Sequence, residues 1–168
     1  MTTAEKYKQF ENSPAIKTIR YIFEKKINGG NDVLENYIKE IKTGKTPSKS
    51  EKKYYEDNYI EWYKPIEIGQ SIYLNGSGDY LSKYAYDKKK VTLYKPNTLL
   101  INCIGDIGRV SILKKEATSN QQITGVLLKD NVLPEYAYLY LVAFRELFYR
   151  NILNTTLSIV NQSKIKKI

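Results

Sequence analysis

The stretch LLINCIGDIGRVSI, residues 99–112, constrains the fold most, because two glycines three positions apart interrupt an apolar, β-branched run. Such a pair either cradles a phosphate or turns the chain. A phosphate-binding loop leads into a helix, whose amides and dipole meet the anion, and the GxxG loop of RNA-binding domains lies between helices. Here the strand formers Val110 and Ile112 follow instead. The pattern predicts that residues 105–108 turn a β-hairpin, with glycine supplying the positive φ angles.

Strand and helix patterns surround this hairpin. Ser13 and Pro14 are typical of a helix start, and Gly29 and Gly30 of a helix end. Strands are expected in 35–41, although 33–41 also fits a helix, and in 59–68, 91–105, 108–113 and 123–130. A helical turn is expected in 82–86 and an amphipathic helix over 135–153. This order indicates an α+β fold: a single globular domain with a small twisted, mostly antiparallel β-sheet and long loops, flanked by an N-terminal helix and a C-terminal amphipathic helix. We expect 1–30 to be a flanking helix and 31–168 the main body.

The charge and the missing residue types limit the function. Lysine plus arginine number 27 against 18 acidic residues, which gives a formal charge of +9 and suits nucleic acid or an anionic surface, unless it only solvates the protein. There is no histidine and one cysteine, so Ser-His or Cys-His catalysis and thiolate zinc sites are excluded. Nothing in the sequence supports catalysis by other groups. We expect a cytoplasmic protein without metal or cofactor, and no segment predicts a membrane span.

An ordered set of motifs identifies a family. It consists of IKEIKTGKTPSKSEKKYY, Trp62, LSKYA, YKPNTLLINCIGDIGRVSI, SNQQITGVLL, PEYAYLYL and SIVNQSKIKKI. In this order and spacing they resemble target recognition domains of type I restriction-modification specificity subunits, over residues 33–168. The resemblance implies a non-catalytic domain that binds double-stranded DNA sequence-specifically and reads one half of a bipartite target. It also implies adenine methyltransferase subunits, a restriction subunit and a second specificity half as partners. The chain then looks like half a subunit or a fragment.

Two segments are the main candidates for DNA contact. The long polar segment after residue 41 offers lysines for phosphates and hydroxyls between them. Gln121 and its neighbours offer amides that can pair with adenine, although in this family the matching residues often look structural. Lys83 and the triplet 88–90 are further phosphate candidates, and Arg109 leaves the glycine turn directly. The candidate residues are Lys42, Lys45, Thr46, Ser48, Lys49, Tyr54, Tyr55, Lys83, Arg109, Asn120, Gln121 and Gln122.

Two other functions remain open at this point. The same charge and the 16 tyrosines would suit a single-strand DNA or RNA-binding module that stacks bases. A half-subunit could also dock methyltransferase subunits without strong DNA affinity of its own. Trp62 and the tyrosines of 136–149 are expected in the core rather than on a stacking surface.

Overall fold

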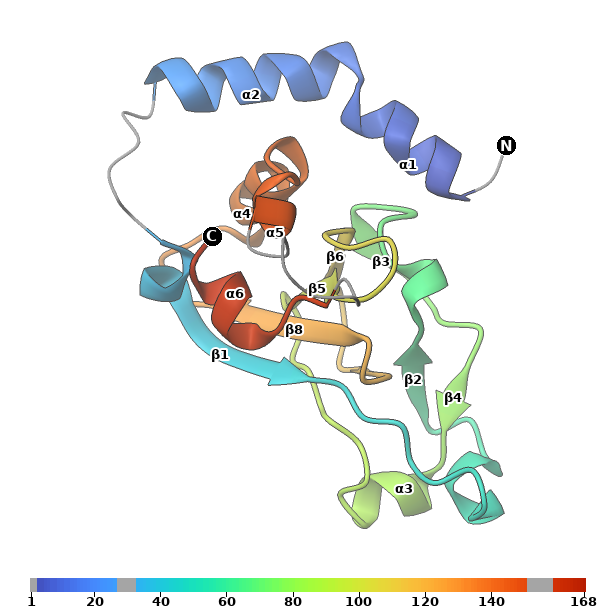
Figure 1. Ribbon diagram of the computed structural model, residues 1–168. Coiled ribbons are helices and arrows are strands. Elements are labelled where there is room, and N and C mark those ends of the chain that lie inside the picture. Colours follow the sequence, from blue (N-terminus) through green and yellow to red (C-terminus); the bar gives the residue numbers. More distant parts are fainter. Residues whose placement is uncertain (1–2, 27–32, 151–158) are drawn as a thin grey trace.

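The computed structural model describes residues 3–26, 33–150 and 159–168 (Figure 1). The helices are α1 (Thr3–Glu11), α2 (Pro14–Lys26), α3 (Lys83–Asp87), α4 (Pro134–Ala143), α5 (Leu147–Arg150) and α6 (Gln162–Lys166), and short 3-10 helices are η1 (Leu34–Tyr37), η2 (Lys52–Tyr55) and η3 (Pro65–Glu67). The strands are β1 (Ile38–Thr43), β2 (Ile60–Tyr63), β3 (Tyr73–Leu74), β4 (Tyr80–Leu81), β5 (Leu99–Asn102), β6 (Val110–Leu113), β7 (Thr118–Ser119) and β8 (Ile123–Leu128). The predicted α+β class is confirmed.

The larger sheet has the order β1-β8-β5-β6-β3 and is antiparallel except where β3 runs parallel to β6. Its centre contains the predicted hairpin, in which Leu99 pairs with Ile112 and Ile101 with Val110. Gly105 and Gly108 have φ angles of 75° and 78°. The glycine pair therefore turns the chain, as its strand-forming neighbours predicted.

A second sheet, β4-β2-β7, differs from the single sheet that we expected. Strand β2 pairs antiparallel with β4 and parallel with β7, and all four of its residues are buried. This strand carries Trp62, which is buried as predicted. The second sheet arises because the polar segments between strands carry β2 and β4 beyond the first sheet, where they pair with each other (Figure 1).

The main core lies between the larger sheet and the helices α2, α4 and α6. Ile101, Ile112 and Val126 from the sheet meet Leu141 and Phe148 from α4 and α5, and all five are at most 1% exposed. A separate cluster of Ile60, Trp62, Leu81, Ala85 and Val91 lies under the second sheet. A third cluster joins the two sheets, because it contains Tyr63 of β2 together with Leu100, Leu113 and Ile123 of the larger sheet.

The N-terminal helix begins where predicted. The Ser13 hydroxyl oxygen accepts a hydrogen bond from the Ile16 amide at 3.3 Å, and Ile16 and Phe23 are buried against the core. A further helix, α1, precedes it, which the sequence pattern did not predict. The expected helix end at Gly29 and Gly30 lies outside the described residues.

The expected single helix over 135–153 is wrong in its length. Helix α4 ends at Ala143, and α5 starts at Leu147. Arg145 lies at the break, where its Nε donates to the Ile107 carbonyl oxygen at 2.6 Å and its guanidinium pairs with Glu11 and Asp106. These long-range partners hold the chain in a turn that a continuous helix would remove. Residues 151–153 lie outside the described part of the chain.

The last residues form a packed segment. Asn161 caps α6 by accepting from the Lys164 amide at 3.0 Å, and Ile165 is fully buried. In the described part of the chain, no helix is long and apolar enough to cross a membrane. Cys103 is a buried free thiol, and its burial raises the pKa of that thiol.

Candidate nucleic-acid interface

Residues 45–59 and 82–90 together form one surface unit, which we call the basic lobe. The amide of Ser82 donates to the Tyr54 carbonyl oxygen at 2.9 Å, and the Ser82 hydroxyl donates to the Lys53 carbonyl oxygen at 2.5 Å. The amide of Lys83 donates to the Asp57 carboxylate at 3.0 Å. Two segments far apart in sequence are therefore fixed side by side, with η2 against α3 (Figure 1).

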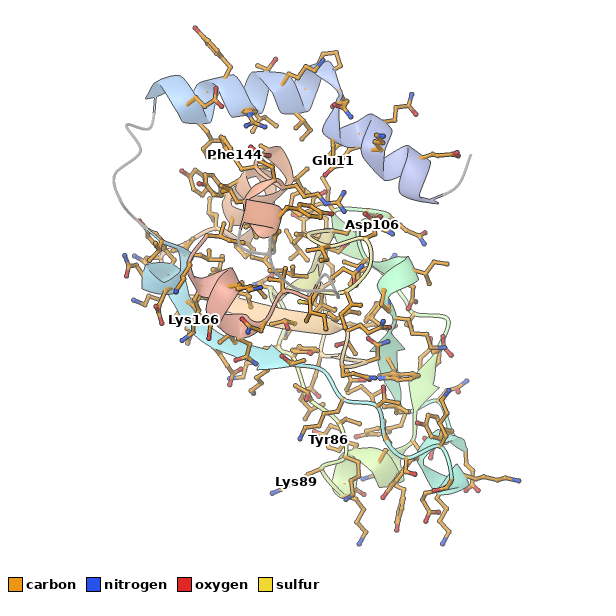
Figure 2. The ribbon with its side chains drawn as sticks, viewed as in Figure 1. Glu11, Tyr86, Lys89, Asp106, Phe144 and Lys166 are labelled. Atoms are coloured by element: carbon orange, nitrogen blue, oxygen red, sulfur yellow. The ribbon has the colours of Figure 1, made fainter. Side chains whose placement is uncertain are left out.

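Lysines and tyrosines alternate on this lobe. Tyr84 stacks on Tyr54 with ring centroids 5.6 Å apart, and the ammonium groups of Lys53 and Lys88 lie 5.9 and 5.7 Å from the Tyr84 ring centroid. Such cation–π contacts hold lysines over aromatic faces while their charges stay in water. Figure 2 shows Tyr86 and Lys89 at this end of the molecule, far from Glu11 and Asp106.

The lobe has an excess of positive charge. Its eight lysines, all exposed, face four acidic residues in the same two segments. Within the described part of the chain, the ion pairs of these lysines are limited to Lys83 with Asp87, at 3.0 Å. That hydrogen-bonded pair also raises the pKa of Lys83. Most of the lobe lysines are therefore not paired with an acidic side chain among the described residues and can bind an anion.

The two segments that the sequence singled out meet at the base of the lobe. The Thr46 hydroxyl donates to the Gln121 side-chain carbonyl oxygen, and the Lys45 amide donates to the Ser119 carbonyl oxygen at 2.9 Å. Gly44 permits this approach, since a Cβ there would lie 2.1 Å from the Asn120 carbonyl oxygen. Gln121 is exposed beside Lys45, so a cation and an amide share one surface.

A groove of about 540 Å³ runs between the lobe and β2. It is lined by Lys49, Lys52, Tyr55, Glu56, Trp62, Lys64 and Asp79. The Lys64 ammonium lies 5.3 Å from the Trp62 ring centroid and 2.7 Å from the Asp79 carboxylate. Sequence reasoning missed Lys64, because it follows a strand pattern in which nothing marks its proximity to Lys49 and Lys52.

Other predicted residues shape the lobe from within. The Tyr55 hydroxyl donates to the Pro47 carbonyl oxygen at 2.7 Å, and burial raises the pKa of Tyr55. The Trp62 indole N–H donates to the Lys45 carbonyl oxygen at 3.2 Å. Ser48 is exposed at the tip of the loop, where its hydroxyl lies 2.7 Å from that of Ser50. Tyr55 and Trp62 thus fix the backbone that carries the lysines.

Four predicted residues lie away from this exposed surface or support it. The Asn120 side chain accepts from the Gln122 amide at 3.0 Å and donates to its side-chain oxygen at 3.1 Å, so both fix the loop before β8. Lys42 pairs with Glu40 at 2.7 Å on β1. Arg109 is only 4% exposed and lies 3.6 Å from Asp106. Burial of its guanidinium argues against the predicted ligand contact.

The lobe combines several kinds of binding group. Among residues 3–26, 33–150 and 159–168, no three histidine, cysteine, aspartate or glutamate side chains come together in a way that could hold a metal ion. The groups that converge at the lobe are ammonium, amide, hydroxyl and aromatic groups, together with four carboxylates. Such groups bind anionic and planar ligands.

Comparison with known proteins shows the family to which the chain belongs. The family model described as the type I restriction modification DNA specificity domain matches residues 36–168, and the chain belongs to this family. The HindI specificity subunit of Haemophilus influenzae is 29% identical over 102 residues, which are 61% of this chain and 22% of that protein. The MjaIX specificity subunit of Methanocaldococcus jannaschii is 29% identical over 103 residues, 60% of this chain and 24% of that protein. The chain thus spans less than a quarter of either relative.

Solved structures share the fold. The HsdS subunit from Thermoanaerobacter tengcongensis superimposes with a TM-score of 0.60 at 12% identity, over 99% of this chain and 39% of that one. A chain from a structure of the type I R-M system complex has the same TM-score at 11% identity, over 98% of this chain and 42% of its own length. The type I S subunit from M. genitalium has a TM-score of 0.53 over 84% of this chain and 34% of its own.

Proposed function

We propose that the chain is a target recognition domain that binds double-stranded DNA sequence-specifically and reads one half of a bipartite target. The observation that carries this proposal is the basic lobe, where two distant segments converge to present eight exposed lysines interleaved with tyrosines. DNA presents a regular array of phosphates, and a row of ammonium groups on a fixed scaffold is the feature that engages it. Membership of the DNA specificity family supports the same ligand.

In this proposal the lobe residues have different tasks. Lys45, Lys49 and Lys83 contact phosphates, while Thr46, Ser48 and Gln121 meet base edges or the backbone beside them. Tyr54 and Tyr55 support the lobe through ring and hydroxyl contacts. Asn120 and Gln122 hold the loop that presents Gln121. Lys42 and Arg109 are left out of the contact set, since Lys42 lies on β1 outside the lobe and Arg109 is buried.

The proposed assembly follows from the family. The domain would contribute specificity without catalysis, and adenine methyltransferase subunits, a restriction subunit and a second specificity half would complete the complex. The relatives are named specificity subunits of type I restriction enzymes, and the chain covers under a quarter of their length. We propose that residues 31–168 are the recognition domain, consistent with the family match over 36–168, and that 1–30 flank it.

Selection from a randomised duplex DNA pool at about physiological salt, with a single-stranded pool alongside, tests the function. Recovery of a short duplex motif, about three to five base pairs, supports a sequence-reading domain. Binding that ignores sequence and collapses with salt means that only charge acts, and it contradicts the proposal. Failure to bind DNA, combined with tight binding to methyltransferase subunits, favours a docking half-subunit instead.

The double substitution of Lys45 and Lys49 by alanine tests the lobe itself. Each lost phosphate contact makes the negative slope of log K against log salt shallower by about one unit. The slope of the double variant is therefore shallower by about two units. Substitution of Lys39 and Lys129 by alanine is the matched control, because both are exposed lysines outside the lobe. An unchanged slope in the Lys45 and Lys49 variant removes this loop from the interface.

Exposed tyrosines give a specific reason to test single strands. Tyr59 is 50% exposed and Tyr84 39% exposed, each with a lysine over its ring. Aromatic faces flanked by cations stack unpaired bases without sequence preference. A preference for the single-stranded pool that Tyr59→Ala and Tyr84→Ala abolish would replace the duplex proposal by a single-strand binding function.

A further inference from the structure

A second cavity lies outside the basic lobe, at the end of the larger sheet. It has a volume of about 410 Å³ and lies where β1 ends, β8 begins and the C-terminal segment crosses. Its polar lining is Thr43, Gln121, Thr124, Asn161, Gln162 and Ser163. The cavity therefore joins Gln121 of the candidate interface to the segment SIVNQSKIKKI, a part of the family pattern that the lobe leaves without a task.

The cavity walls are held in place by direct contacts. The hydroxyls of Thr43 and Thr124 lie 3.1 Å apart on paired strands, and the Gln162 side-chain amide donates to the Thr43 hydroxyl oxygen at 3.0 Å. The C-terminal segment is fixed by the Val160 amide, which donates to the Cys103 carbonyl oxygen at 3.0 Å. The buried Ile165 anchors the helix behind it. Side chains on such a fixed scaffold keep their geometry before a ligand arrives.

The chemistry of the lining indicates one class of ligand. All six polar residues carry neutral amides or hydroxyls, and the remaining lining, Cys103, Ile104, Ile159 and Val160, carries no charge either. Arginine and lysine contact phosphates and also read guanine, but neutral amides and hydroxyls that both donate and accept hydrogen bonds can pair with other base edges, as glutamine does with adenine. Apolar side chains beside them suit the thymine methyl group.

The position of the cavity agrees with this chemistry. Gln121 lines the cavity, and its side-chain carbonyl oxygen accepts a hydrogen bond from the Thr46 hydroxyl. Thr46 follows Lys45 in the loop that begins the lobe. Lys45 is in turn tied to the backbone of Ser119 in the loop before β8. A duplex whose phosphates follow the lysines at the base of the lobe therefore passes beside Gln121.

We propose that this cavity is a base-reading site, in which Gln162 and Ser163 of the C-terminal segment determine specificity together with Gln121. The ligand is the edge of one or two DNA base pairs exposed in a groove. The proposal rests on the proposed duplex binding and goes beyond it, because it assigns specificity to Gln162, 41 residues after Gln121, and separates base reading from phosphate binding.

Motif selection with three variants tests the site. Gln162→Ala removes the amide that faces Thr43, and Ser163→Ala changes an exposed side chain that makes a small demand on folding. Gln70→Ala is the matched control, because Gln70 is an exposed glutamine whose amide also donates to a nearby carbonyl oxygen, that of Ile66, and it lines neither cavity. Each folded variant is selected against the randomised duplex pool, and its salt slope is measured.

The expected result is a loss of preference at one or two positions of the motif. Discrimination there falls roughly tenfold for Gln162→Ala and Ser163→Ala, whereas the salt slope and the other positions stay as in the wild type. Gln70→Ala selects the wild-type motif. If the wild type selects a motif and both cavity variants select it unchanged, the cavity is structural and this inference fails alone. If the wild type selects no motif, the proposed function fails with it.

Discussion

The backbone N–H of Lys89 donates to the Tyr86 carbonyl oxygen at 2.9 Å, and the turn holds Lys89 at a φ of 53°. The Lys90 amide donates to the Ala85 carbonyl oxygen at 3.0 Å, which completes the end of α3. Glycine usually fills this left-handed position after a helix, since a side chain there is strained. A lysine at this point of the basic lobe (Figure 2) suggests that charge is kept at the expense of stability.

Lys89→Gly should therefore separate stability from binding. Relief of the left-handed strain raises the free energy of unfolding by roughly 1 kcal/mol, while loss of the ammonium group lowers the DNA salt slope by about one unit if Lys89 meets a phosphate. Urea unfolding and salt titration measure the two effects. Lys90→Gly is the control, because it removes the same charge without a positive φ and should lower stability by about 0.5–1 kcal/mol. A less stable Lys89→Gly variant contradicts the strain argument.

The two hairpin glycines should respond differently to alanine. Both have positive φ, so each substitution costs roughly 1 kcal/mol of backbone strain. A Cβ at Gly105 meets nothing within 4 Å, whereas at Gly108 it lies 2.7 Å from the Phe148 ring, which is 1% exposed. Gly108→Ala therefore loses a further 1–3 kcal/mol or so from overpacking. Equal losses in urea unfolding would show that the ring moves freely.

The predictability of the fold follows the range of the interactions. The hairpin was predictable because the φ requirement of Gly105 and Gly108 is local and the neighbouring residues are strand formers. The break after Ala143 was not, because it depends on the contacts of Arg145 with Glu11 and Asp106, far away in sequence. The pairing of β2 with β7 was likewise set by tertiary structure rather than by either segment.

The candidate interface shows the same division. Lys45, Thr46 and Gln121 were predicted from residue type and motif, and the structure brings them together. The groove with Lys64 was missed, because only the fold brings a lysine after β2 to the loop of Lys49. The prediction for Arg109 took no account of burial, because charge in a sequence does not report it, and in the fold Arg109 is 4% exposed.

The Glu11 carboxyl should make stability depend on pH. Burial raises its pKa above 4.5, although Arg145 opposes the shift. The folded state then binds a proton more tightly than the unfolded state, so this contribution to stability is full below pH 4.5 and is lost as the pH rises through the raised pKa. The free energy of unfolding of the wild type, minus that of Glu11→Gln at each pH, isolates the contribution of the Glu11 carboxyl. A contribution of Glu11 to stability that increases as the pH rises would contradict this prediction.

Removal of Arg145 should raise the Glu11 pKa further. The guanidinium lies 3.0 Å from the Glu11 carboxylate and stabilises its charged form, which lowers the Glu11 pKa. In Arg145→Met this opposing contribution is lost, and the burial that raises the pKa remains. NMR titration of the Glu11 carboxyl in both proteins measures the change. Arg20→Met serves as the control, since Arg20 pairs with Glu24 and Glu146 instead of Glu11. A lower Glu11 pKa in Arg145→Met would show that the contact between α1 and the hairpin opens.

Lys64→Gln tests whether DNA phosphates reach the groove beside Trp62. The Lys64 ammonium is held by Asp79 and by the Trp62 ring, on the wall opposite the loop that carries Lys49 and Lys52. If a phosphate lies between these lysines, the variant loses about 0.9 units of salt slope. Lys39→Gln is the matched control, since Lys39 also pairs with an aspartate at 2.8 Å but lies on β1 outside the lobe. Equal salt slopes for the two variants would show that phosphates do not reach the groove. Lys64 would then act only through its contact with the Trp62 ring.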